Sequence, residues 1–246
     1  MNEVIKTMED HRSIRSFLNK EISEDIIKEL IDVAQAAPNS INGQQTSVIV
    51  VRDKEEKAKL AELSGGQACI KQAPVFFMFI ADFYKIKLAS EKVDIPLVIT
   101  ESVESIMVAA IDAGLSMQNV ITAAESLGLG IVPIGGVRNS PKEVIEILKL
   151  PKFTYPLVGL VLGYPADHSK IKPRMPRESY RHDEVYNKEK LPAIINRYDE
   201  DMKKYLKNIK GEKEVDWSSS IMSVYKYVYH PKVYQSLKRQ GFKNER

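Results

Sequence analysis

The stretch Pro74-Val75-Phe76-Phe77-Met78-Phe79-Ile80-Ala81 is apolar along its length. A strand with one face in water alternates apolar and polar residues, so this run predicts a strand that is covered on both faces. Shorter apolar runs at 47–51, 130–136 and 157–162 predict further strands of the same sheet. Such a sheet needs helices on both sides to bury it.

Helical patterns separate the predicted strands. Ser23 is an N-cap residue before an apolar stripe that stops ahead of Pro38, and residues 54–63 predict a surface helix. Ser140-Pro141-Lys142-Glu143 combines the N-cap, proline and acidic residues that begin a helix. The pattern at 101–127 is apolar around much of its circumference, which predicts a helix buried on several sides, in part by a second subunit. This order of elements indicates an α/β or α+β sandwich.

The character of the chain changes from Pro165 onward. In order, the sequence predicts an extended connector with Pro173 and Pro176, an amphipathic helix at 191–207, a mobile loop at 208–215, and aromatic helical segments at 217–229 and 231–238. No composition shift marks a second autonomous domain. We therefore expect a single domain over 1–246, in which about 165–246 wraps a neighbouring element or the partner subunit.

Composition argues against several functions. The 36 basic and 33 acidic residues leave a net charge of +3, and lysines alternate with acids along most helices, unlike the concentrated basic face of a nucleic-acid binder. One cysteine and four scattered histidines suggest no disulfide and no metal site. The N-terminus lacks an apolar signal core, and the run at 75–81 is too short to span a bilayer. We expect a cytoplasmic protein that binds neither nucleic acid nor membrane.

Two basic clusters, His11-Arg12-Ser13-Ile14-Arg15 and Lys172-Pro173-Arg174, lie far apart in the sequence. Only folding can bring them together, and a compact dianion between them would explain the convergence, because arginine matches phosphate bidentately and lysine adds a point charge. Between them comes Pro133-Ile134-Gly135-Gly136, whose glycines allow bare backbone to approach a flat ligand. These features predict a phosphate-bearing cofactor, with flavin mononucleotide (FMN) as the leading candidate.

Six motifs occur in order over nearly the whole chain. They are 11–17 (HRSIRSF), 64–67 (SGGQ), 123–130 (AAESLGLG), 134–139 (IGGVRN), 162–167 (LGYPAD) and 172–176 (KPRMP). The chain thereby resembles the flavin-dependent nitroreductase superfamily, close to its oxygen-insensitive nitroreductase and NADPH–flavin reductase branch. The resemblance implies an α+β, three-layer α/β/α sandwich with a mostly antiparallel sheet and a C-terminal extension packed on the dimer partner. It also implies a homodimer with FMN at the subunit interface.

The activity implied by the resemblance is two-electron reduction of nitroaromatics, free flavins, quinones or similar acceptors by NADPH or NADH, in a ping-pong mechanism. The resemblance implies that Arg15, Lys172 and Arg174 hold the FMN phosphate, with His11 close by, and that Arg12 and Ser13 meet the ribityl chain or the pyrimidine edge. It places Gln67 at the imide edge, and Asn39 and Ser40 in a loop that is Ser-rich in relatives. One face of the flavin ring would be lined by Pro133, Ile134, Gly135 and Gly136. A backbone N–H near Gly135 would donate to the flavin N5. No protein nucleophile or metal is needed, because the flavin carries the redox chemistry.

The acceptor and dinucleotide contacts are less closely matched to relatives. Arg138 lies beside the glycine-rich strand, and His230 stands where relatives have an arginine that lines the pocket. Lys210 and Lys213 stand where relatives use arginines for the 2′-phosphate of NADPH, which makes NADH a plausible donor as well. Two other functions stay open: a non-catalytic FMN carrier on the same scaffold, and a nucleic-acid or membrane-surface binder that exploits the pI of about 8.7.

Overall fold

The computed structural model describes residues 2–167, 169–210 and 215–245. The chain forms two compact units: a larger unit of residues 1–169 and 230–246, and a smaller unit of residues 170–229. Each unit is described by itself below.

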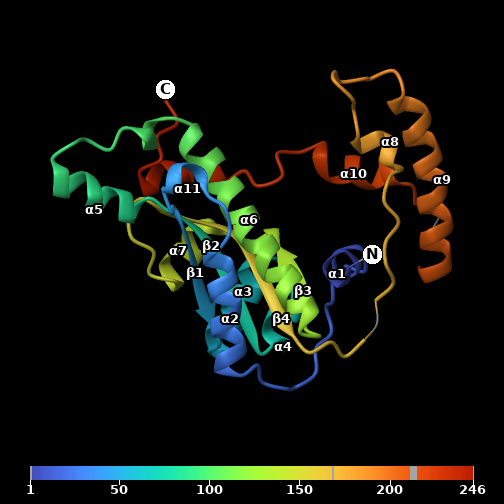
Figure 1. The fold of residues 1–246 in the computed structure, drawn as a ribbon, viewed down its shortest axis with the longest axis horizontal. Helices are drawn as coiled ribbons and strands as arrows, with labels where there is room; N and C mark the ends of the chain where they lie inside the picture. Colours follow the sequence, from blue (N-terminus) through green and yellow to red (C-terminus); the bar gives the residue numbers. More distant parts are fainter. Residues whose placement is uncertain (1, 168, 211–214, 246) are drawn as a thin grey trace. The chain divides into compact units, whose positions relative to one another are not determined.

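The larger unit is built on a four-stranded sheet in the order β1-β2-β4-β3 (Figure 1). Its strands are β1 (Thr46–Val51), β2 (Val75–Asp82), β3 (Gly130–Ile134) and β4 (Thr154–Gly163). All three pairings are antiparallel, with Phe77 opposite Val50 on one side and Leu160 on the other. The four predicted strands and the antiparallel sheet are confirmed.

Helices cover both faces of this sheet. The helices of the larger unit are α1 (Glu3–Glu9), α2 (Glu24–Gln35), α3 (Lys54–Leu63), α4 (Ala68–Gln72), α5 (Tyr84–Val93), α6 (Glu104–Ser126), α7 (Pro141–Ile147) and α11 (Val233–Gln240), with short 3-10 turns η1 (Ser40–Asn42), η2 (Ile99–Glu101) and η3 (Gly135–Arg138). Of these, α2 and α6 lie on one face and α3, α4 and α7 on the other. Helix α3 has the predicted bounds, while α6 begins three residues later than predicted and η2 precedes it. The strand predicted at 130–136 ends at Ile134, because the chain turns into η3 there.

Alternate side chains of β2 enter two separate cores. Phe77 and Phe79 are fully buried in a cluster that includes residues of α2 and α6. Phe76 and Met78 are equally buried in a second cluster with residues of α3, α4 and α7. Because successive strand residues point to opposite faces, these clusters define three layers, helix, sheet and helix. The predicted α+β sandwich is confirmed.

Helix α6 is long and apolar enough to cross a membrane by length and composition alone, a test that core helices of soluble proteins also pass. The sequence interpretation considered only the run at 75–81 for this property. In the structure, Ala109, Ala113 and Val120 of α6 are buried in the same cluster as Phe77 of β2. Helix α6 therefore has the packing of a core helix along its sheet-facing side.

The smaller unit consists of α8 (Arg177–Tyr180), α9 (Leu191–Lys210) and α10 (Trp217–Tyr225) with their connections. Asp199 of α9 accepts hydrogen bonds from the amide and hydroxyl of Ser218 at 2.9 and 2.7 Å, which fixes α10 on α9. Of the predicted mobile loop, residues 208–210 belong to α9 and residues 211–214 lie outside the described residues. The wrapping of a partner by the C-terminal region stays a prediction.

Candidate functional site

The segment His11–Phe17 lies against the edge strand β3. Ile14 donates its amide proton to the carbonyl of Ile131 at 2.9 Å, and Ser13 forms a parallel bridge to the same residue. A Cβ added to Gly130 would lie 2.8 Å from Ile14, so glycine is needed for this close approach. The first basic cluster is therefore held at the sheet edge by backbone contacts.

The three basic side chains of this segment have different surroundings. His11 Nδ1 lies 2.7 Å from Glu125 Oε1 of α6, and Arg12 is engaged by both the carbonyl and the carboxylate of Asp10. Arg15 is exposed and forms no ion pair with any described residue. It lies near Cys69, where burial raises the pKa of the thiol and the positive charge of Arg15 opposes that shift. Arg15 is thus the cation of this cluster that is available to a ligand.

Gln67 and the glycine turn after β3 are in contact. A Cβ on Gly136 would lie 2.3 Å from the carbonyl oxygen of Ser64 and 2.9 Å from Gln67 Nε2. Gln67 Nε2 donates to the Ser64 carbonyl at 3.2 Å, while its Oε1 accepts no hydrogen bond from the described residues. Pro133 is exposed within an otherwise buried strand. The end of β3 therefore presents a glycine turn, an exposed proline and an available amide acceptor.

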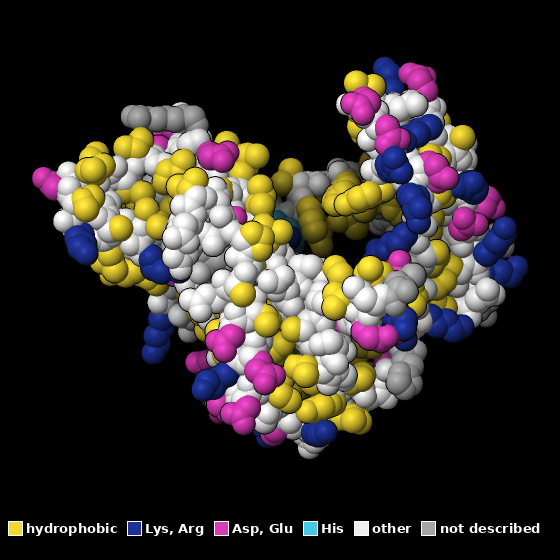
Figure 2. Space-filling model, viewed as in Figure 1, with side chains coloured by type: hydrophobic (Ala, Val, Ile, Leu, Met, Phe, Trp, Pro, Cys, Tyr) yellow, Lys and Arg dark blue, Asp and Glu magenta, His cyan; other side chains and the backbone are white. Residues whose placement is uncertain are grey.

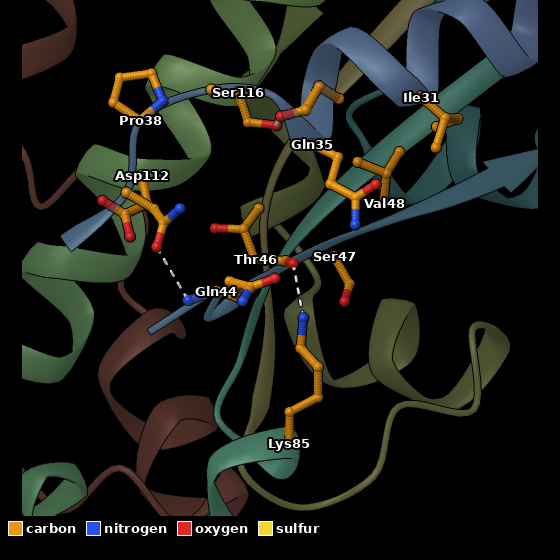
Figure 3. Close-up of a pocket in the computed structure, with 13 residues that line it drawn as sticks. Ile31, Gln35, Pro38, Gln44, Thr46, Ser47, Val48, Lys85, Asp112 and Ser116 are labelled. Carbon is orange, nitrogen blue, oxygen red and sulfur yellow. Dashed lines mark hydrogen bonds between the residues drawn. The ribbon is translucent and has the colours of Figure 1, made fainter. Parts of the chain in front are cut away.

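Asn39 and Ser40 lie elsewhere on the larger unit. The Ser40 amide donates to both carboxylate oxygens of the buried Asp112 on α6, at 3.2 Å each. A cavity of about 280 Å³ is lined by Asn39 and Asp112. Figure 3 shows Asp112, Thr46 and Lys85 around it, with Lys85 donating to the Thr46 carbonyl at 3.0 Å. Asp112 and Glu125 are 13 residues apart on α6, so these two groups are separated by roughly 20 Å at 1.5 Å per residue.

Arg138 and His230 are neighbours although 92 residues separate them. Arg138 donates to the Leu157 carbonyl at 2.6 Å, and a Cβ on Gly135 would lie 3.1 Å from its Nη2. Burial, followed by the positive charge of Arg138, lowers the pKa of His230. Burial also raises the pKa of Tyr155 to about 12, against the opposing charge of Arg138. The two predicted acceptor-site residues are thus brought together beside Gly135.

Lys172 and Arg174 belong to the smaller unit, and both are exposed. The connector that carries them is held on α9, where the Tyr198 hydroxyl donates to the Pro173 carbonyl at 2.8 Å. Burial raises the pKa of Tyr198, and the nearby Arg174 opposes the shift. Convergence of these two cations with Arg15 stays a prediction. Lys213 lies outside the described residues, and Lys210 is described only as the last residue of α9.

The sequence interpretation missed Glu125, Asp112 and Tyr198. Glu125 lies within one of the quoted motifs, yet nothing in the sequence links it to His11, 114 residues away. Asp112 is a single acid in an apolar helix, and Tyr198 is one of 11 tyrosines. Among the described residues, no group of three or more potential metal ligands occurs.

Comparison with known families agrees with this arrangement. Residues 8–164 match the Nitroreductase family, and residues 172–245 match the Nitroreductase family, C-terminal domain. The chain therefore belongs to the nitroreductase family, which confirms the resemblance seen in the motifs.

Relatives of this chain are similar over its full length. An FMN reductase [NAD(P)H] of Bacillus subtilis (strain 168) is 49% identical over 249 residues, covering 100% of both chains. The structure of NfrA2 from B. megaterium matches with a TM-score of 0.98 and 48% identity, again over 100% of both chains. An NADPH:FMN oxidoreductase from Vibrio harveyi, complexed with NAD+, matches with a TM-score of 0.89 and 31% identity over 98% of this chain and 99% of that one.

Proposed function

We propose that this protein is an FMN-dependent NAD(P)H oxidoreductase that reduces nitroaromatics, free flavins, quinones or similar acceptors. The observation that carries the proposal is the packing of Gln67 on the Gly135–Gly136 turn at the end of β3, with Arg15 near Cys69, two residues after Gln67. Relatives of similar length are named FMN reductase, which supports the same activity here. No observation favours a non-catalytic carrier or a nucleic-acid binder.

The residues at this strand end fit FMN chemically. Arg15 offers a guanidinium that no described acid neutralises, as a phosphate monoester requires. The available Oε1 of Gln67 can accept from the ring imide N–H, and the exposed Pro133 offers an apolar surface to the ring. We propose that Lys172 and Arg174 add to the phosphate site. To bind the cofactor, the Arg12 guanidinium would have to give up its hydrogen bonds to Asp10.

When bound, the flavin carries the two electrons between NAD(P)H and the acceptor in separate half-reactions. The chain's part is orientation and charge. We propose that the Gly135 amide donates to the flavin N5 and that Arg138, fixed by the Leu157 carbonyl, provides positive charge beside it for the acceptor. His230 would line the same place, and Lys210 and Lys213 would meet the dinucleotide. We expect the protein to act in the cytoplasm, where NAD(P)H is supplied.

Anaerobic addition of NADPH or NADH to the FMN-loaded protein tests this function. The oxidised flavin absorbance should disappear, and a nitroaromatic or quinone added afterwards should restore it. A carrier would keep its oxidised spectrum after either dinucleotide is added, and that result would overturn the proposal.

We further propose that the protein is a homodimer with FMN at the subunit interface. One chain places Ser40 at Asp112, roughly 20 Å along α6 from the His11–Glu125 pair, and this separation supports a flavin that takes Asn39 and Ser40 from the other chain. Helix α6 and its N-cap Val103 also bear an apolar stripe, which comprises Val103, Met107, Ile111 and Leu115, each 40–59% exposed. Figure 2 shows hydrophobic side chains gathered over α5 and the adjoining part of α6. An unpaired stripe at this spacing is typical of a helix that packs on a partner.

Replacing Ile111 with glutamate should convert the dimer to a monomer, because a charge in the centre of an apolar interface is costly to bury. Sedimentation velocity would measure the change, and FMN retention should fall with it. Leu127→Glu is the matched control, since Leu127 is equally apolar and 44% exposed but lies beyond the stripe. An I111E protein that stays dimeric would show that the stripe is not the interface.

A further inference from the structure

We propose that Glu125 is a positioning residue that orients His11 so that the imidazole Nε2 is presented to the FMN phosphate. The inference rests on the proposed function and adds a residue to its phosphate site. It assigns Glu125 a role that acts through His11 and not by direct contact with the cofactor.

The geometry of the pair fixes the state of the imidazole ring. His11 Nδ1 lies 2.7 Å from Glu125 Oε1, and the side chains are 27% and 14% exposed. An ionised carboxylate can only accept hydrogen bonds, so Nδ1 carries the hydrogen. Nε2 lies on the opposite side of the ring and forms no hydrogen bond with the described residues. It is therefore the atom that a ligand would meet, and it donates to a phosphate oxygen in the imidazolium form, in which both ring nitrogens carry hydrogen.

The donors around Glu125 offset part of the cost of burying its carboxylate. Burial raises its pKa, and His11 and then Arg12, including the Arg12 backbone amide, oppose that shift. A desolvated carboxylate needs such donors, because an unpaired buried charge is costly. Glu125 thus touches both residues that open the basic cluster. At many ligand sites a carboxylate accepts a hydrogen bond from one ring nitrogen of a histidine and thereby orients the other nitrogen toward the ligand.

The pair is not needed to hold the backbone of the segment. The Ile14 amide bonds to Ile131, the Leu18 amide to Tyr164, and the Ser16 carbonyl accepts from Ala166, all at 2.8–2.9 Å. These contacts anchor the segment along β3 and the end of β4 whether or not Glu125 is present. Removing the carboxylate should therefore change the orientation of His11 more than the path of the chain.

A double-mutant cycle on cofactor binding tests the inference. Apoprotein of the wild type, Glu125→Ala, His11→Ala and the double variant would be titrated with FMN and with riboflavin, which lacks the phosphate. Each single variant should bind FMN about tenfold more weakly, as for loss of a charge-assisted hydrogen bond. The double variant should be no weaker than H11A, and riboflavin affinity should be unchanged throughout. Glu29→Ala, on the exposed side of α2, is the matched control.

The outcomes separate the inference from the function on which it rests. Equal weakening of riboflavin and FMN in E125A, additive effects in the double variant, or an unchanged FMN affinity in E125A would each overturn the role of Glu125 while leaving the oxidoreductase intact. Should E125A fail to fold, Glu125→Gln replaces it; its amide oxygen keeps the hydrogen bond to Nδ1 without the negative charge, so a smaller loss, still selective for FMN, is expected. Failure of the wild type to bind any flavin would instead overturn the proposed function.

Discussion

Replacement of Arg15 by alanine is expected to weaken FMN binding by about ten- to a hundredfold. The guanidinium is exposed and forms no ion pair with a described residue, so its loss removes ligand contacts and leaves no buried acid unpaired. Charge-assisted hydrogen bonds contribute about 1.5–3 kcal/mol, and each 1.4 kcal/mol is a tenfold change in affinity. Fluorescence titration of the apoprotein, together with the flavin retained after gel filtration, would measure the effect.

The matched control is Arg52→Ala, which removes an exposed arginine just after β1 that pairs with Glu24. It should leave FMN affinity unchanged. Arg174→Ala should weaken binding like Arg15→Ala, because both side chains are proposed to meet the same phosphate. Cofactor occupancy that is unaffected in both variants would contradict the phosphate assignment, whatever the effect on activity.

Gly136→Ala is expected to lower the free energy of unfolding by about 1–3 kcal/mol, the usual effect of overpacking. The new Cβ would lie 2.3 Å from the Ser64 carbonyl oxygen, a backbone atom that cannot move without shifting the loop that carries Gln67. FMN affinity should fall as well, since Gln67 would lose its position. Urea denaturation of the apoprotein and FMN titration would measure the two effects separately.

Gly135→Ala provides the comparison for stability. There the nearest atom to the new Cβ is Nη2 of Arg138 at 3.1 Å, a side-chain atom that needs to give by only a few tenths of an ångström, while the Nη1 bond to Leu157 can stay in place. The unfolding free energy should therefore change much less than in Gly136→Ala. If Gly136→Ala were as stable as the wild type, this would contradict the claim that the glycine turn packs too closely on the Ser64–Gln67 loop to admit a Cβ.

Elements with a buried face could be predicted from the sequence. The apolar run at 75–81 identified the central strand β2, and the pattern at 54–63 matched α3 exactly. Helices α1 and α5 were not predicted, because neither has a buried residue and so neither shows an apolar stripe. The end of β3 was placed two residues late, since Ile134 and the glycines that follow read as one apolar run.

The candidate site was predictable only for residues that belong to recognisable sequence motifs. Arg15, Gln67 and the glycine turn came from motifs, and the structure shows which of their atoms are available. His11 pairs with Glu125, which is 114 residues away, and Ser40 pairs with Asp112, which is 72 residues away. Single acids in a helical pattern carry no sign of their distant partners. Such pairs appear only when the chain is folded.

The most direct measurement is the cofactor content of the purified protein. We expect a yellow protein that releases FMN, and not FAD, on acid denaturation, in an amount equimolar with the chain. Colourless protein that also takes up no FMN from an excess in solution would contradict the account.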